Sequence, residues 1–239
     1  MSLICHVTNT GPLSTTMSEM DLDMSCPSGS FGRLHLPSII TKSTGTTITV
    51  TDQLIKITNM TAFKGFVKSL TQDESLVFRL ENGHATIKGF LLYAKITYSK
   101  DVQLKGMNGP RTEMVSTEVK GKGFVNRMKT WNPSPVEMDV GTVKQDVRNG
   151  KGETIAEQKG VVYYTRGETE YAMEGTLTGL LPDGESRIVG VGAEEDNWNN
   201  ETIPFHDTPM NLTDEFVALC KRNSEALSQP GSSNEQHQS

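Results

Sequence analysis

Two stretches of the chain share one pattern: "VTNTGPLSTTMSEMDLDM" at residues 7–24 and "KTWNPSPVEMDVGTVKQDV" at residues 129–147. In each stretch an Asn is followed three residues later by a Pro, and a run of alternating residues comes next. The same offset separates Asn9 from Asn132 and the first Pro from the second. Because Pro fixes φ and ends a strand, each Asn-x-x-Pro element predicts a sharp corner between two strands. The repetition therefore predicts two tandem units of one β fold.

Alternation of apolar and polar residues runs through most of the chain and indicates half-buried strands. In "MSEMDLDM" the side chains of Met20, Leu22 and Met24 share one face, while Asp21 and Asp23 point the other way. Gly, Asn, Pro and Ser separate such runs at intervals of roughly eight to twelve residues, which is typical of a sandwich or barrel. The expected fold class is all-β: two tandem, immunoglobulin-like antiparallel β-sandwiches, each with a short helix.

Two segments have helical spacing instead. "NMTAFKGFVKSL" places Phe63, Phe66, Val67 and Leu70 on one stripe, and Asn59 stands at the N-cap position. This pattern predicts a helix over residues 60–70 whose apolar stripe packs into the first sandwich.

The second helical segment is "NLTDEFVALCKRN", which groups Leu212, Phe216, Leu219 and Cys220 on one face. Either Asn211 or Thr213 can cap it. After Leu227 the chain is polar and has no apolar periodicity. The predicted organisation is a first unit over residues 1–114, a second and divergent unit over 115–227, and a disordered tail over 228–239.

The overall charge excludes one class of partner. A net charge of −6 and a pI near 5.4 do not fit a nucleic-acid binder, which needs a basic face. No apolar run approaches the roughly 20 residues of a membrane-spanning helix. The start of the chain lacks the apolar region of a signal peptide. The three cysteines show no paired spacing, so reduced thiols are expected. These features predict a cytoplasmic protein without a transmembrane segment, and they leave peripheral membrane contact open.

The pattern "NTGPLSTT…LDM…FGRLHLP…TITVTDQLIKITNMTAFKGFVKSL…LVFRLENGHATIKG…YSKDVQLKGMNG" resembles a fungal domain family of unknown function. That family looks like a relative of the plant group-two late embryogenesis abundant (water-stress/hypersensitive-response) domain. The resemblance covers most of residues 3–109, and residues 115–227 resemble the same unit more weakly through "NPSP" and "GETEYAMEGTL". It implies an immunoglobulin-like sandwich with one helix per unit. Family members often carry an N-terminal transmembrane anchor, whereas this chain is expected to begin in its first strand. The resemblance implies no catalytic motif.

Signatures of catalysis and of cofactor binding are absent from the sequence. There is no G-x-S-x-G, no phosphate-binding Gly-rich loop, no H-E-x-x-H and no dinucleotide-binding G-x-G-x-x-G. We therefore expect no cofactor and no metal site. The histidines are scattered, and those that lie in strands are interpreted as packing or edge residues.

One segment without a counterpart in the first unit, residues 190–211, combines acids, a histidine and aromatics. If the protein is an enzyme, an acid beside aromatic rings can serve as a general acid, and a His oriented by an Asp can serve as a base. The rings can shield an apolar substrate or stabilise positive charge. The alternative interpretation is a solvated acidic loop. The candidate catalytic residues are Glu194, Glu195, Asp196, His206 and Asp207, and the candidate ligand-binding residues are Trp198 and Phe205.

The sequence supports three hypotheses for function. The first is a non-catalytic binding module for a hydrophobic ligand, a lipid or a protein partner. The second is a cofactor-independent cyclase or isomerase of fungal specialised metabolism, acting by general acid/base catalysis on a lipophilic terpenoid, meroterpenoid or polyketide intermediate. The third, a protective protein of desiccation stress, fits the ordered β pattern poorly. An apolar cavity of several hundred Å³ would favour a ligand over a scaffold role.

Overall fold

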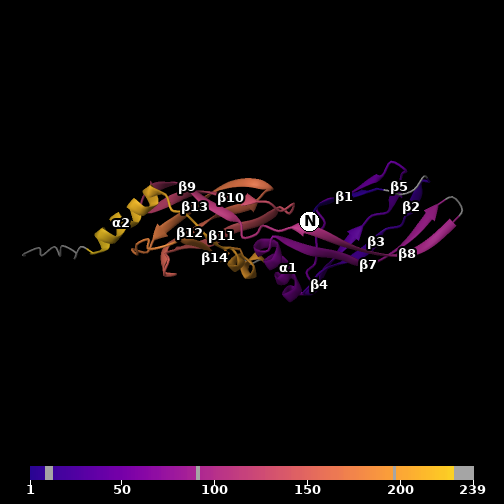
Figure 1. Ribbon diagram of the computed structural model, residues 1–239, viewed down its shortest axis with the longest axis horizontal. Helices are drawn as coiled ribbons and strands as arrows, with labels where there is room; N and C mark the ends of the chain where they lie inside the picture. The colour runs from indigo at the N-terminus through magenta and orange to yellow at the C-terminus, as the bar shows by residue number, and fades with distance from the viewer. Residues whose placement is uncertain (9–12, 90–91, 196–197, 229–239) are drawn as a thin grey trace, which may run out of the picture. The chain divides into compact units, whose positions relative to one another are not determined.

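The computed structural model describes residues 1–8, 13–89, 92–195 and 198–228, apart from the side chain of Asn199. Backbone contacts divide the chain into two compact units. Unit 1 contains Met1–Ser69 and Ser75–Leu104, and unit 2 contains Leu70–Glu74 and the chain from Lys105 onward. The described residues form antiparallel sheets with two α-helices, which confirms the expected all-β, sandwich-like fold class (Figure 1).

The elements of unit 1 are β1 (Leu3–Val7), β2 (Thr15–Met17), β3 (Met20–Cys26), β4 (Gly29–Leu36), β5 (Ile39–Thr41), β6 (Thr46–Val50), most of α1 (Met60–Gln72), β7 (Ser75–Gly89) and nearly all of β8 (Leu92–Lys105). Strands β1 and β6 pair with each other, and the main sheet has the order β4-β3-β7-β2-β5 with β8 paired to β7. The length of β7 explains this order, because it pairs with β3 near its start and with β2 near its end.

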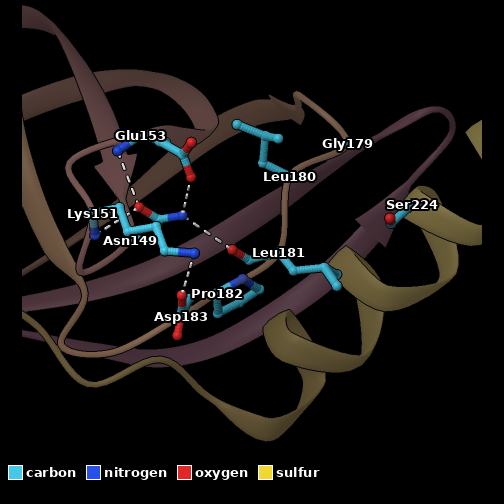
Figure 2. Close-up of a pocket in the computed structure, with 9 residues that line it drawn as sticks. All are labelled: Asn149, Lys151, Glu153, Gly179, Leu180, Leu181, Pro182, Asp183 and Ser224. Atoms are coloured by element: carbon cyan, nitrogen blue, oxygen red, sulfur yellow. Dashed lines mark hydrogen bonds and ion pairs between the residues drawn. The ribbon is translucent and has the colours of Figure 1, made fainter.

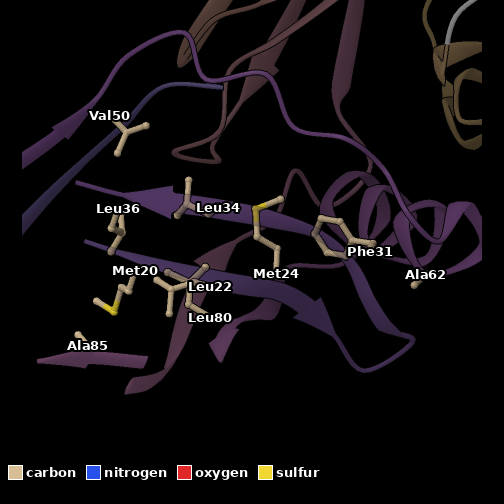
Figure 3. Packing of buried hydrophobic residues seen from close by; sticks show 10 residues of the cluster. All are labelled: Met20, Leu22, Met24, Phe31, Leu34, Leu36, Val50, Ala62, Leu80 and Ala85. Atoms are coloured by element: carbon tan, nitrogen blue, oxygen red, sulfur yellow. The ribbon is translucent and has the colours of Figure 1, made fainter. Parts of the chain in front are cut away.

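The core of unit 1 is built from the inward residues of β3 and β4 (Figure 3). Met20, Leu22 and Met24 are buried, as their alternation predicts, and they pack in one cluster with Leu34 and Phe31. The outward residues of β3 contact polar side chains of the neighbouring strand β4: Asp21 lies within hydrogen-bonding distance of the His35 ring, and Asp23 forms an ion pair with Arg33.

Helix α1 begins where the sequence predicts it. The Asn59 side-chain oxygen accepts a hydrogen bond from the Ala62 N–H at 3.1 Å, which caps the helix. The rings of Phe63 and Phe66 lie 5.7 and 5.1 Å from that of Phe31, and the helix thereby covers one end of the unit 1 core. The predicted packing of this apolar stripe is confirmed for these two rings.

The elements of unit 2 are β9 (Arg111–Lys120), β10 (Gly123–Asn132), β11 (Met138–Arg148), β12 (Thr154–Tyr164), β13 (Gly167–Leu177), β14 (Arg187–Ala193), the short 3-10 helices η1 (Trp198–Glu201) and η2 (Ile203–Phe205), β15 (Asp207–Pro209) and α2 (Asp214–Ser228). The strands form one sheet in the order β15-β14-β11-β12-β13-β10-β9. Its two end strands, β15 and β9, lie near each other, so the sheet curls around an interior. The position after residue 114, where the sequence analysis ends the first domain, lies inside β9.

The corner predicted at Asn132 is held by its own side chain. The Asn132 oxygen accepts a hydrogen bond from the Ser134 N–H, and its amide nitrogen donates to the Val136 carbonyl, both at 2.9 Å. This corner joins β10 to β11, which are not neighbours in the sheet. The matching element at residues 9–12 lies outside the described residues.

Helix α2 starts after Thr213, whose hydroxyl accepts a hydrogen bond from the Phe216 N–H at 3.2 Å. Phe216 is buried with its ring edge-on to Phe124, and Cys220 is buried beside it on the same helix face. Of the tail expected at residues 228–239, Ser228 ends α2 and the rest lies outside the described residues. Neither helix in the described ranges is long and apolar enough to cross a bilayer.

Candidate functional site

The segment that the sequence analysis selects leaves β14 at Ala193 and returns through η1 and η2 to β15. The Glu194 carboxylate forms an ion pair with Lys159 at 2.8 Å on the exposed surface. The Glu195 carboxylate accepts a hydrogen bond from the Thr142 N–H at 3.2 Å. Hydrogen bonds from its own backbone N–H and from Thr142 lower the pKa of Glu195. Asp196, the third candidate acid, lies outside the described residues.

His206 is buried, unlike the acids. Its ring stacks on that of Tyr164, with centroids 5.3 Å apart and planes 17° apart, and its Nδ1 lies 3.5 Å from the Tyr164 hydroxyl oxygen. Burial lowers the pKa of His206 to about 4, because the protonated imidazole would lose its hydration at this position without gaining a compensating interaction. Burial also raises the pKa of Tyr164 well above its ordinary value. Both groups are therefore neutral near pH 7.

The candidate partner of His206 has a different contact. Asp207 is exposed and its carboxylate forms an ion pair with Arg187 at 2.8 Å. Within the described residues no hydrogen bond joins Asp207 to His206, so the structure shows no His–Asp dyad there. Trp198 begins η1 at the surface, and Phe205 ends η2 and is half-buried. The structure thus gives the described acids and His206 separate partners.

Unit 2 also carries an open pocket of about 480 Å³, away from those candidates (Figure 2). Asn149 lies in its wall: its side-chain oxygen accepts hydrogen bonds from the N–H groups of Lys151 and Glu153, and its nitrogen donates to Glu153 and to the Leu181 carbonyl. The ion pair of Lys151 with Asp183 spans 2.8 Å. These polar groups connect the two turns that form the wall. They therefore stabilise the fold through contacts with one another.

A second open pocket, of about 590 Å³, lies on the outer face of β3 and β4 in unit 1. Two contacts join titratable groups of its wall: the His35 ring lies 2.9 Å from the Asp21 carboxylate, and Arg33 forms an ion pair with Asp23 at 3.1 Å. Lys56 also lines this pocket. The first pocket has a wall of mixed polarity, the second is lined mostly by polar residues, and both are open rather than the enclosed apolar cavity that a buried lipophilic ligand would need.

Other reactive groups offer little chemistry. In the part of the chain that the structure describes, no three His, Cys, Asp or Glu residues gather as metal ligands. The three cysteines are free, and burial raises the pKa of Cys220 to about 11, which makes its thiol unreactive at neutral pH.

A surface that the sequence analysis missed lies at one end of unit 1, where β2, β5 and the β7–β8 hairpin meet (Figure 1). Ile40 of β5, Thr16 of β2 and Lys88 of β7 are register partners across three adjacent strands. Four apolar side chains of this end are open to solvent: Leu13 (65 % exposed), Ile40 (59 %), Leu92 (79 %) and Tyr93 (72 %). We call Leu13, Ile40, Lys88, Leu92 and Tyr93 the unit 1 tip.

A sequence signal for the unit 1 tip exists. The hairpin turn reads "KGFLLYAK" at residues 88–95, with an apolar run where turns normally carry polar residues. An analysis of alternation alone misses this apolar run, because alternation assigns the residues of a strand to its two faces and gives no information about the ends of the strand. Phe90 and Leu91, between the two strands, lie outside the described residues.

Taken together, the fold and its surfaces define an all-β, sandwich-like protein with an exposed apolar end on unit 1. A family described as "Protein of unknown function (DUF3712)" matches residues 29–147, from β4 of unit 1 to β11 of unit 2. The predicted resemblance to a domain family of unknown function is supported to that extent. The chain matches no curated protein.

One of the solved structures that match this chain is similar at a low level. Its title reads "Inhibition of the exo-beta-D-glucosaminidase CsxA by a glucosamine-configured castanospermine and an amino-australine analogue". It is 12% identical, with 85% of this chain and 25% of that chain covered and a TM-score of 0.24. The chain therefore spans a quarter of the length of that protein, and a likeness at this score carries no argument about fold or function.

Proposed function

We propose that the protein is a non-catalytic binding module and that the unit 1 tip is its contact surface for a hydrophobic partner. The observation that supports this is the exposure of Leu92 and Tyr93 at the end of a long hairpin. Burying such a side chain fully stabilises a contact by roughly 1.5–3 kcal/mol, so two or three of them suffice for reversible binding.

The packing of unit 1 and the character of the two pockets favour a binding surface over an internal ligand site. The buried apolar side chains of unit 1 pack in one cluster, and both pockets are open and have charged residues in their walls. The alternative function, a cyclase or isomerase, gains no observation of its own, because Glu194 and Asp207 are in surface ion pairs and His206 is buried against Tyr164.

Finer parts of the resemblance also belong to this proposal. We propose that residues 1–114 and 115–227 are tandem copies of one unit, related to the group-two late embryogenesis abundant domain, in a fungal protein of the cytoplasm. The side-chain-held corner at Asn132 and the presence of α1 and α2 in successive parts of the chain support the duplication.

Retention on an immobilised octyl matrix at high salt tests the binding surface, because salt screens charge and leaves apolar contact. The test variant is Leu92→Ser/Tyr93→Ser, and the matched control is Val161→Ser/Tyr163→Ser, an exposed aliphatic–tyrosine pair on β12. We expect the test variant to lose retention and the control to keep it, with equal melting temperatures. Equal retention of both variants would refute the assignment of the unit 1 tip.

A further inference from the structure

The charges around the unit 1 tip differ from those of the chain as a whole. The protein has 29 acidic residues and a net charge of −6. The segments that meet at this end, residues 13–18, 37–43 and 83–98, contain Lys42, Lys88 and Lys95 but no Asp or Glu. An apolar end inside a local positive field complements a surface that is both apolar and negatively charged.

The two hairpin lysines keep their charges available. Some lysines of unit 2 have an acidic partner, such as Lys120 with Glu174 at 2.6 Å and Lys159 with Glu194 at 2.8 Å. Within the described residues, neither Lys88 nor Lys95 forms an ion pair. The Lys88 Nζ lies 5.5 Å from the centre of the Tyr93 ring, in a cation–π contact.

This combination matches the chemistry of a membrane interface. Tyr rings are enriched at the level of lipid headgroups, where the ring is in apolar surroundings and the hydroxyl in water. Lysines reach from such positions toward phosphates while their methylene stems cover apolar surface. A leucine beside them can enter the boundary between headgroups and acyl chains.

We propose that the unit 1 tip docks on the surface of an anionic phospholipid membrane, with Leu92 and Tyr93 entering the interface and Lys88 and Lys95 contacting lipid phosphates. This inference rests on the proposed binding function and names its partner. A membrane fits better than an acidic protein, because Leu92 and Tyr93 are 79 % and 72 % exposed beside the two lysines, and an anionic lipid surface complements both the apolar side chains and the positive charges.

The test is sedimentation of the full chain with vesicles of phosphatidylcholine alone, or of phosphatidylcholine with phosphatidylserine. We expect binding to the vesicles that contain phosphatidylserine and its loss at high salt. Lys88→Gln/Lys95→Gln should weaken that binding roughly 25-fold, since each lysine near an anionic surface contributes about fivefold. Lys120→Gln/Lys122→Gln in unit 2 removes the same charge and should leave binding unchanged. Leu92→Ser/Tyr93→Ser should abolish it.

The outcomes separate the two proposals. Retention on octyl chains through the tip, without binding to either vesicle, refutes the membrane inference and leaves the binding function standing. If Leu92→Ser/Tyr93→Ser still binds vesicles as the unmodified protein does, the apolar contact on which both proposals rest is refuted. If the Lys88/Lys95 and Lys120/Lys122 variants lose vesicle binding equally, the docking site is also refuted, because binding would then depend on the total charge of the protein and not on the position of the lysines. Binding to a polyglutamate matrix as strong as to vesicles would replace the membrane with an acidic protein.

Discussion

The interiors of the two units differ in chemistry although both are built from alternating strands. In unit 1 the centre of the Phe31 ring lies 5.1–6.3 Å from the ring centres of Phe63, Phe66 and Phe78. Aliphatic side chains and methionines make up most of the rest of the cluster, and Figure 3 shows them around Phe31. Stability there comes from apolar surface removed from water and from ring packing. Substitutions in the interior of unit 1 are therefore expected to lower stability mainly by removing packed apolar volume, and only slightly by breaking hydrogen bonds.

The interior of unit 2 contains a chain of buried polar side chains. The Thr117 hydroxyl donates to Asn126 at 2.7 Å, the Asn126 amide donates to Gln158 at 2.9 Å, and the Gln158 amide donates to Gln145 at 3.3 Å. Gln145 and Gln158 are also register partners in β11 and β12. A buried polar group without a partner is costly, so this chain penalises any other register of the strands.

Truncating the ring at the centre of unit 1 should have the largest effect. Phe31→Ala removes a buried ring that contacts three others and leaves a cavity, so the free energy of unfolding should fall by about 3–5 kcal/mol. Chemical denaturation monitored by circular dichroism measures it. Tyr93→Ala, an exposed aromatic of the same unit, is the control and should change stability little. If Phe31→Ala lowers the free energy of unfolding no more than Tyr93→Ala does, the aromatic cluster is not what stabilises unit 1.

Interrupting the polar chain of unit 2 should have the next largest effect. Gln158→Leu keeps the volume but leaves the Asn126 amide and the Gln145 oxygen without partners. Two such buried groups cost roughly 2–4 kcal/mol. Gln103→Leu, on the exposed part of β8, should be nearly neutral.

The double variant Gln145→Leu/Gln158→Leu sharpens the same comparison. Its loss should be smaller than the sum of the two single losses, because the second substitution removes a group that the first leaves unpaired. Strict additivity, measured in the same denaturation experiment, would contradict a connected polar interior.

Acid should destabilise unit 2 through His206. Its pKa is about 4 in the folded protein and 6.5 ordinarily, so below pH 6.5 the unfolded chain binds a proton that the folded chain does not. Stability is unaffected above that pH and decreases as pH falls toward 4, by about 2 kcal/mol between pH 7 and pH 5. His206→Asn should flatten this part of the stability–pH curve, whereas His84→Asn, at an exposed position, should not. An unchanged slope in His206→Asn would place the acid sensitivity elsewhere.

The sequence predicts features that depend on neighbours along the chain. The inward face of Met20, Leu22 and Met24 follows from strand periodicity, and the cap at Asn59 follows from local hydrogen bonding. For the second helix the sequence offers Asn211 or Thr213 as the cap, and the structure selects Thr213. These features need no knowledge of the other strands.

Features that depend on distant segments could not be predicted in this way. His206 is 42 positions from Tyr164, and the sequence around either residue gives no indication that their rings stack. Alternation places Gln145 and Gln158 on inward faces, but it gives no sign that their partners would also be polar. His206 and Asp207 are adjacent in the sequence, which suggested a catalytic dyad. His206 has extended backbone just before β15, and adjacent side chains of extended backbone point to opposite faces, so the two residues meet different partners.

The smallest expected effect separates buried His206 from exposed Asp207. A double-mutant cycle with Asp207→Asn and Arg187→Gln should give a coupling of only about 0.2–1 kcal/mol, because the ion pair is solvated and exposed. The pKa of His206, followed by NMR in Asp207→Asn, should stay where it is, since desolvation and not a carboxylate sets it. If Asp207 did orient and stabilise a His206 cation, its neutralisation would lower that pKa further. Such a shift would restore the acid/base interpretation of this segment, whereas an unmoved titration leaves His206 as part of the polar interior of unit 2 and Asp207 as part of its surface.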